Sequence, residues 1–124
     1  MALLEWSDAL ALDLPLMDDT HHEFVELLAT VEAAPDTMLL AAWQALIDHT
    51  DGHFGQEDDW MQATRFASSN CHSLHHQVVL GVMREGAVLG AGGALLAVRQ
   101  MARELAAWFP HLAQSMDAPL ALPL

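Results

Sequence analysis

The sequence contains no lysine and no tyrosine, and its four basic residues, all arginine, stand against 17 acidic ones. A formal net charge of −13 repels phosphate backbones and anionic lipid, so we expect neither nucleic acid nor a membrane surface as a partner. A single cysteine, Cys71, excludes an intramolecular disulfide and a zinc cluster of several thiolates. No basic segment precedes the apolar N-terminal residues and no apolar run is long enough to span a bilayer, so a cytoplasmic protein is expected.

Alanine, leucine and histidine are abundant instead. Hydrophobic residues make up 53% of the 124 residues, which suffices for one compact core and excludes a disordered chain. Alanine and leucine favour helices, whereas the β-branched residues that favour strands are few. We therefore expect an all-α protein with a single domain over residues 1–124.

Apolar side chains recur every three or four residues in four segments, as they do on one face of a helix. The first segment follows Pro15, and Pro35 separates it from the second. The third should end near Gly86, where four glycines indicate a loop, and the fourth contains Pro110, which should kink it. The apolar stripe of the fourth segment is Val98, Met101, Leu105, Trp108 and Leu112.

Four helices joined by short turns predict an antiparallel up-down four-helix bundle. We assign residues 17–117 to the bundle, residues 1–16 to an N-terminal arm and residues 118–124 to a tail. We expect a chain of this length to be too short for a separate output domain, so any sensing role would need a partner protein.

Eight histidines are the most unusual feature of the composition. His53 and Glu57 lie four residues apart, so both occupy one face of a helix. His72 and His76 have the same spacing. Imidazole and carboxylate donors together suit iron, manganese or zinc, and a bundle core can hold two such ions. With one residue each from the first and last helices, the candidate metal ligands are His21, His53, Glu57, His72, His76 and Asp117.

Several motifs occur together in an order typical of one family. They are Trp6, Asp18-Asp19-Thr20-His21, His53-Phe54 with Glu57, the segment from His72 to His76, Trp108-Phe109-Pro110, and Met116-Asp117. In these motifs, which extend over nearly the whole chain, the protein resembles the hemerythrin family in its bacterial branch. The resemblance implies a four-helix bundle with two oxo- or hydroxo-bridged non-haem iron ions that bind dioxygen reversibly.

The resemblance also implies a role for each candidate ligand. His21 and His53 would bind one iron, and the pair His72 and His76 would bind the other. The two carboxylates, Glu57 and Asp117, would bridge the irons.

One position departs from the family pattern, which has a fifth histidine five residues before the bridging aspartate. Counting back from Asp117 gives Leu112, and the nearest histidine is His111. At about 100° per residue, Leu112 falls on the inner stripe of the last helix and His111 lies about 100° away. Either the second iron lacks this ligand, or a distortion at Pro110 brings His111 to it as a tentative ligand.

The remaining histidines have simpler interpretations. His22 and His75 each follow or precede a candidate ligand and should point to the surface. His49 lies one turn before His53 on the same face, so it should either touch the metal or, as we favour, serve as a hydrogen-bonded core histidine near it.

We expect a monomer or weak oligomer that carries, stores or senses dioxygen or a related ligand such as nitric oxide. The principal alternative is an enzyme, a di-iron peroxidase or oxidase that uses the position left open at Leu112 to bind peroxide. A third interpretation is an iron-handling protein whose site has degenerated to one metal.

Overall fold

The structure is a computed structural model that describes the backbone of residues 15–64 and 69–112 and the side chains of residues 19–63 and 73–110. Within these residues the chain forms helices and turns and contains no strand. The helices are α1 (Pro15–Ala33), α2 (Asp36–Thr64), α3 (Ser69–Ala91) and α4 (Leu95–Leu112). Within the described part of the chain, none of the helices is both long and apolar enough to cross a membrane.

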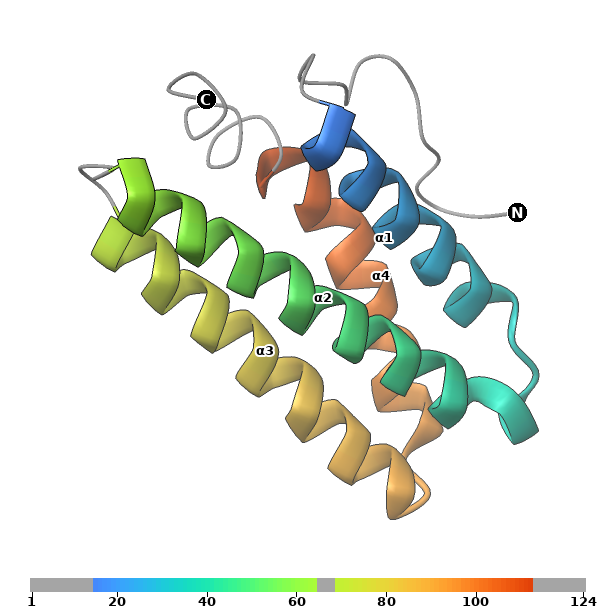
Figure 1. Cartoon of the computed structure of the whole chain (residues 1–124). Helices are drawn as coiled ribbons and strands as arrows, with labels where there is room; N and C mark the ends of the chain where they lie inside the picture. The colour runs from blue at the N-terminus through green and yellow to red at the C-terminus, as the bar shows by residue number, and fades with distance from the viewer. Residues whose placement is uncertain (1–14, 65–68, 113–124) are drawn as a thin grey trace.

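The four helices form the predicted antiparallel bundle (Figure 1). Each helix packs against the next one along the chain, and α1 closes the bundle against α4. Short connections between successive helices force them to run in opposite directions. The last two residues of the predicted arm begin α1, and the rest of the arm and the tail lie outside the described residues.

The turn between α1 and α2 shows how local sequence and packing combine. Pro35 ends α1 because it cannot continue the backbone hydrogen bonding of a helix, and Asp36 places a carboxylate in the first turn of α2. Arg99 of α4 donates hydrogen bonds to the Ala34 carbonyl at 2.9 Å and to Asp36 Oδ1 at 2.6 Å. Arg99 therefore links the turn between α1 and α2 to α4.

The end of α3 differs from our prediction. The helix does not end at Gly86 but continues to Ala91, so the predicted loop is five residues too long at its start. A Cβ at Gly86 would clash with the thioether of Met101, and one at Gly90 would clash with Leu40. Each glycine costs helix stability of about 1 kcal/mol relative to alanine, and close approach of α2 and α4 offsets that cost.

The core contains apolar side chains from all four helices. On α4 the predicted stripe is partly wrong, because Met101, Leu105 and Trp108 are only half-buried. Among the residues of this helix whose side chains are described, the buried ones are Val98, Ala102, Ala106 and Phe109. Two of them are alanines, which contribute little area themselves but let α4 approach its neighbours, and a search for large apolar residues overlooks them.

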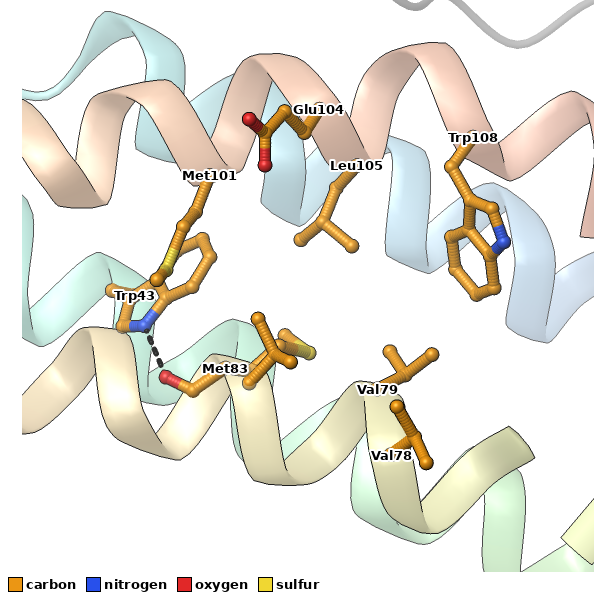
Figure 2. A pocket seen from close by; sticks show the side chains of 9 residues that line it. Trp43, Val78, Val79, Met83, Met101, Glu104, Leu105 and Trp108 are labelled. Atoms are coloured by element: carbon orange, nitrogen blue, oxygen red, sulfur yellow. Dashed lines mark hydrogen bonds between the residues drawn. The ribbon is translucent and has the colours of Figure 1, made fainter. Parts of the chain in front are cut away.

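The half-buried residues of α4 border an apolar cavity of about 190 Å³ between α2, α3 and α4 (Figure 2). Trp43 of α2 lies at one end, and its indole Nε1 donates a hydrogen bond to the Met83 carbonyl of α3 at 2.9 Å. With its single donor satisfied, the indole presents carbon to the cavity. The other lining residues are Val78, Val79, Val82, Met101, Glu104, Leu105 and Trp108.

Candidate metal centre

Three of the predicted ligands lie together in the core. His21 from α1 and both His53 and Glu57 from α2 each offer a ligand atom, and these atoms all lie within 4.8 Å of one another. All three residues are buried, with exposed fractions of 0%, 4% and 0%. The imidazole rings of His21 and His53 have centroids 4.9 Å apart. The spacing of four residues on α2 therefore does place both side chains toward the histidine of α1.

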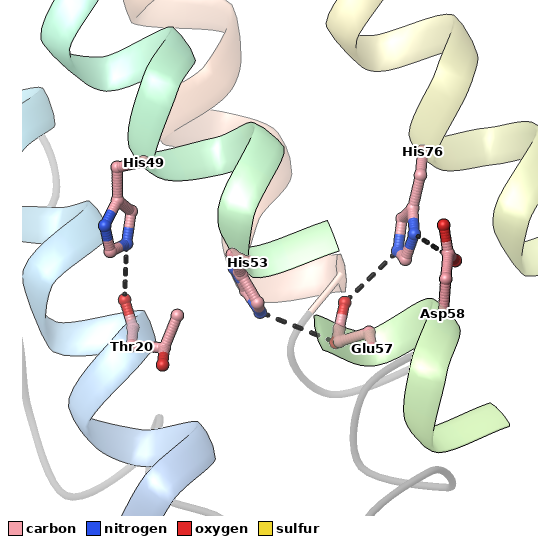
Figure 3. Close-up of polar contacts among 6 residues, drawn as sticks. All are labelled: Thr20, His49, His53, Glu57, Asp58 and His76. Carbon is pink, nitrogen blue, oxygen red and sulfur yellow. Dashed lines mark hydrogen bonds and ion pairs between the residues drawn. The ribbon is translucent and has the colours of Figure 1, made fainter. Parts of the chain in front are cut away.

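Glu57 faces histidines of two different helices (Figure 3). Its Oε2 lies 3.5 Å from His53 Nε2 on its own helix, and its Oε1 lies 3.2 Å from His76 Nε2 on α3. Each carboxylate oxygen is thus directed toward a different imidazole. This is the arrangement that a carboxylate needs in order to contact two cations at once.

Asp58 orients His76 from the other side, a role that our sequence analysis missed. Its Oδ1 lies 3.1 Å from His76 Nδ1 and accepts a hydrogen bond of 2.8 Å from the Ser73 hydroxyl. Because a carboxylate only accepts, Nδ1 carries the proton and the Nε2 of a neutral ring presents its lone pair toward Glu57. The sequence does contain one signal for this role, because Asp58 directly follows Glu57. One residue turns a helix by about 100°, so the two carboxylates point to adjacent faces of α2.

Aromatic rings enclose the polar groups. Phe54 of α2 stacks on the ring of His76 with centroids 3.9 Å apart and an interplanar angle of 6°. On the other side Phe109 of α4 meets His21 edge-on at 5.3 Å and stacks on Phe24 at 4.7 Å. These rings exclude water from the histidines, which raises the cost of burying the Glu57 carboxylate unless a cation compensates it.

The donor set of this group fits iron. Imidazole nitrogens with a carboxylate are a known combination for non-haem iron, whereas a magnesium or calcium site would be expected to contain mainly oxygen donors. A metal ion between the lone pairs of the histidines and Glu57 would also supply the positive charge that a fully buried carboxylate requires.

Other predicted ligands cannot be placed by their side chains. The backbone of His72 belongs to α3, four residues before His76, but its side chain lies outside the described residues. The side chains of His111 and Leu112 also lie outside them, as does all of Asp117. The choice between Leu112 and His111 at the second metal position therefore stays a prediction.

The other three histidines differ from one another in their surroundings. His22 is half-exposed, as predicted, and its Nε2 lies 3.1 Å from Glu26. His75 is not a simple surface residue, because it is half-buried with its ring 5.4 Å from that of Trp108. His49 is half-buried beside α1, where its Nε2 lies 3.0 Å from the Thr20 carbonyl oxygen.

Comparison with known proteins yields three relevant relatives, although no protein-family model matches the chain. A bacteriohemerythrin from Ralstonia nicotianae is 35% identical over 117 residues, which cover 94% of this chain and 85% of the relative. A bacteriohemerythrin from Stenotrophomonas maltophilia is 29% identical over 64% of this chain and 55% of the relative. A myohemerythrin from Sipunculus nudus is 28% identical over 64% of each. The extent and identity of the first match show that this chain belongs to the hemerythrin family.

Proposed function

We propose that the chain is a non-haem iron protein that binds dioxygen, or a related small ligand such as nitric oxide, as a carrier, store or sensor. The observation that carries this proposal is the position of Glu57, buried between His53 of α2 and His76 of α3 with one oxygen toward each. Membership of the hemerythrin family supports the same function.

In this proposal two iron ions occupy the core. His21 and His53 hold the first ion on the side of α1 and α2. His76, with His72 one turn earlier on α3, holds the second. Glu57 and Asp117 would supply carboxylate ligands to both ions, and an oxo or hydroxo group would complete the pair.

The protein's own residues prepare the site for a small ligand. Bound iron supplies the electrons and the coordination position that dioxygen requires. Asp58 holds the Nδ1 proton of His76 so that the opposite nitrogen is available to a metal. Phe54 and Phe109 keep water, and with it protons, away from the histidines that they contact.

Metal analysis tests the proposal directly. We expect two irons per chain in protein prepared with and without air, and an absorption band that appears in air and fades under vacuum. A protein that takes up no iron would contradict the function. One iron per chain would instead support an iron-handling protein with a degenerate site.

The second candidate function is a di-iron peroxidase or oxidase, and Leu112 is the observation that favours it. An incomplete set of protein ligands leaves a coordination position to which peroxide can bind. Sustained oxidation of a reducing dye by peroxide would support the enzyme. His111→Ala tests the restored ligand by metal analysis and absorption spectroscopy, because unchanged iron content and spectrum would eliminate His111 from the site.

A further inference from the structure

We propose that His49 and Glu23 form a second metal site, open to solvent, where Fe²⁺ binds first on its way to the buried histidines. This inference rests on the proposed function, because it supposes that the core receives iron. It concerns how the ion reaches a site whose inner residues, His21 and Glu57, are completely buried.

A surface depression between α1 and α2 has His53, one member of the buried group, in its lining. It has a volume of about 410 Å³, and its lining residues are Thr20, Asp48, His49, Gly52, His53 and Gln56. Of these, His53 is a proposed iron ligand with 4% of its surface exposed. His49 lies one turn before it on α2, with the two ring centroids 6.4 Å apart. An ion held at His49 is therefore close to the first histidine of the core.

The hydrogen bond of His49 determines which of its two ring nitrogens carries the proton. Nε2 lies 3.0 Å from the Thr20 carbonyl oxygen, which can only accept, so Nε2 carries the proton (Figure 3). In a neutral ring Nδ1 is then an acceptor, and it lies 3.6 Å from Glu23 Oε2. Two acceptors that face each other are unfavourable unless a cation lies between them.

The separation of these two atoms suits a metal ion. Bonds of about 2.1 Å to nitrogen and to oxygen are typical of transition metals of this size, and two such bonds span 3.6 Å at an open angle. Glu23 is 65% exposed and His49 is 16% exposed, so the pair lies where solvent and core meet. A proton on Nδ1 is the competing occupant, and it would make the pair an ordinary surface ion pair.

Charge favours the arrival of a cation on this side of the bundle. Residues 1–59, which include α1 and most of α2, contain 14 of the 17 acidic residues and none of the four arginines. A surface of one sign raises the local concentration of the opposite ion and the rate of its capture. Because this effect spreads over the whole surface, it attracts Fe²⁺ to α1 and α2 generally, and the His49–Glu23 pair would select the place of binding.

The test is the rate of anaerobic Fe²⁺ uptake by the metal-free protein, followed by the spectrum of the iron-loaded product. Glu23→Gln and His49→Gln should slow uptake by about tenfold, a factor at the lower end of electrostatic capture effects. Both should leave the final iron content and spectrum unchanged. Glutamine at residue 49 can still donate to the Thr20 carbonyl but lacks the second ring nitrogen.

Glu26→Gln is the matched control, because it removes the same charge three residues along α1 from a carboxylate that pairs with His22 instead. It should take up iron at the wild-type rate. Equal slowing by Glu23→Gln and Glu26→Gln would show general charge attraction alone and would contradict the proposed site. A wild-type uptake rate in Glu23→Gln would contradict it as well. A lower final iron content in His49→Gln would make His49 part of the core site, whereas a wild-type protein that binds no iron would contradict the proposed function itself.

Discussion

The bundle consists of two helical hairpins, α1 with α2 and α3 with α4, which differ in charge and in the kind of surface that they contribute. The sequence up to residue 59, which supplies α1 and most of α2, contains 14 acidic residues and no basic one, and it supplies His21, His53 and Glu57 to the core. From residue 60 onward there are three acidic residues and four arginines. Of the described residues in that half, only His76 joins the polar group in the core. Of the four proposed ligands whose side chains the structure describes, three therefore lie in the acidic hairpin and one, His76, lies in the other.

The second hairpin contributes mainly apolar surface. With Trp43 of α2 it encloses the cavity of about 190 Å³, and Glu104 is the only charged residue of its lining. α3 also exposes apolar side chains, since Leu74, Val78 and Val82 are exposed by 62%, 58% and 46%, and the two valines border the cavity. The difference teaches that the apolar cavity is separate from the buried carboxylate, because none of the proposed ligands lines it.

The largest effect should come from the residue on which the metal centre depends. Glu57→Gln replaces a charged carboxylate with a neutral amide that has one acceptor oxygen, so it can neither bridge two ions nor balance their charge. We expect at least half of the bound iron to be lost, as measured by metal analysis. Glu104→Gln, the same change in the second hairpin, should retain all of it, and equal losses in the two variants would contradict the division between hairpins.

Next in size is the packing around the apolar cavity, to which α2 contributes Trp43. Trp43→Ala removes a completely buried ring and its hydrogen bond to Met83, which should lower the free energy of unfolding by about 3–5 kcal/mol. Denaturant unfolding measures this loss. Iron content should stay at the wild-type value under conditions where the variant is folded, and a parallel loss of iron would show that packing and metal binding are not separate.

The third prediction concerns the link between the hairpins at His76. Asp58→Ala removes the acceptor of the Nδ1 proton, so the ring can turn away from Glu57 and iron affinity should fall by about 10- to 100-fold. Competition with a chelator measures the affinity. Asp59→Ala, at the exposed neighbouring position, is the control and should have no such effect. Asp58→Asn should retain part of the affinity, because the amide oxygen can still accept the hydrogen bond from His76 Nδ1.

The smallest effect is expected at Arg99, which joins α4 to the turn between α1 and α2. Its partner Asp36 is 71% exposed, so Arg99→Ala should lower the free energy of unfolding by about 1 kcal/mol. Arg103→Ala should change it less, because Arg103 donates to Gln100 on its own helix. Thermal unfolding of both variants is the measurement, and a larger loss at Arg103 would contradict the proposed link.

The sequence was sufficient to predict much of the fold and part of the site. The apolar period and the prolines predicted where helices begin, and the spacing of four residues predicted that His53 and Glu57 share a face. The predicted helix end at Gly86 was wrong, because a glycine inside a helix cannot be distinguished from a glycine in a loop in one sequence. In the folded bundle Met101 and Trp43 occupy the space that a side chain at this position would need.

What the sequence determined by itself was local: four helices, their order, and the donors each one carries, since these follow from a period of 3.6 residues and from backbone preferences. The tertiary structure decided which atoms meet. The two oxygens of Glu57 face different helices, Asp58 orients His76, and His49 reaches the backbone of α1 at Thr20. These contacts depend on the rotation and distance of one helix relative to another, which packing sets and which no local pattern along a single helix records.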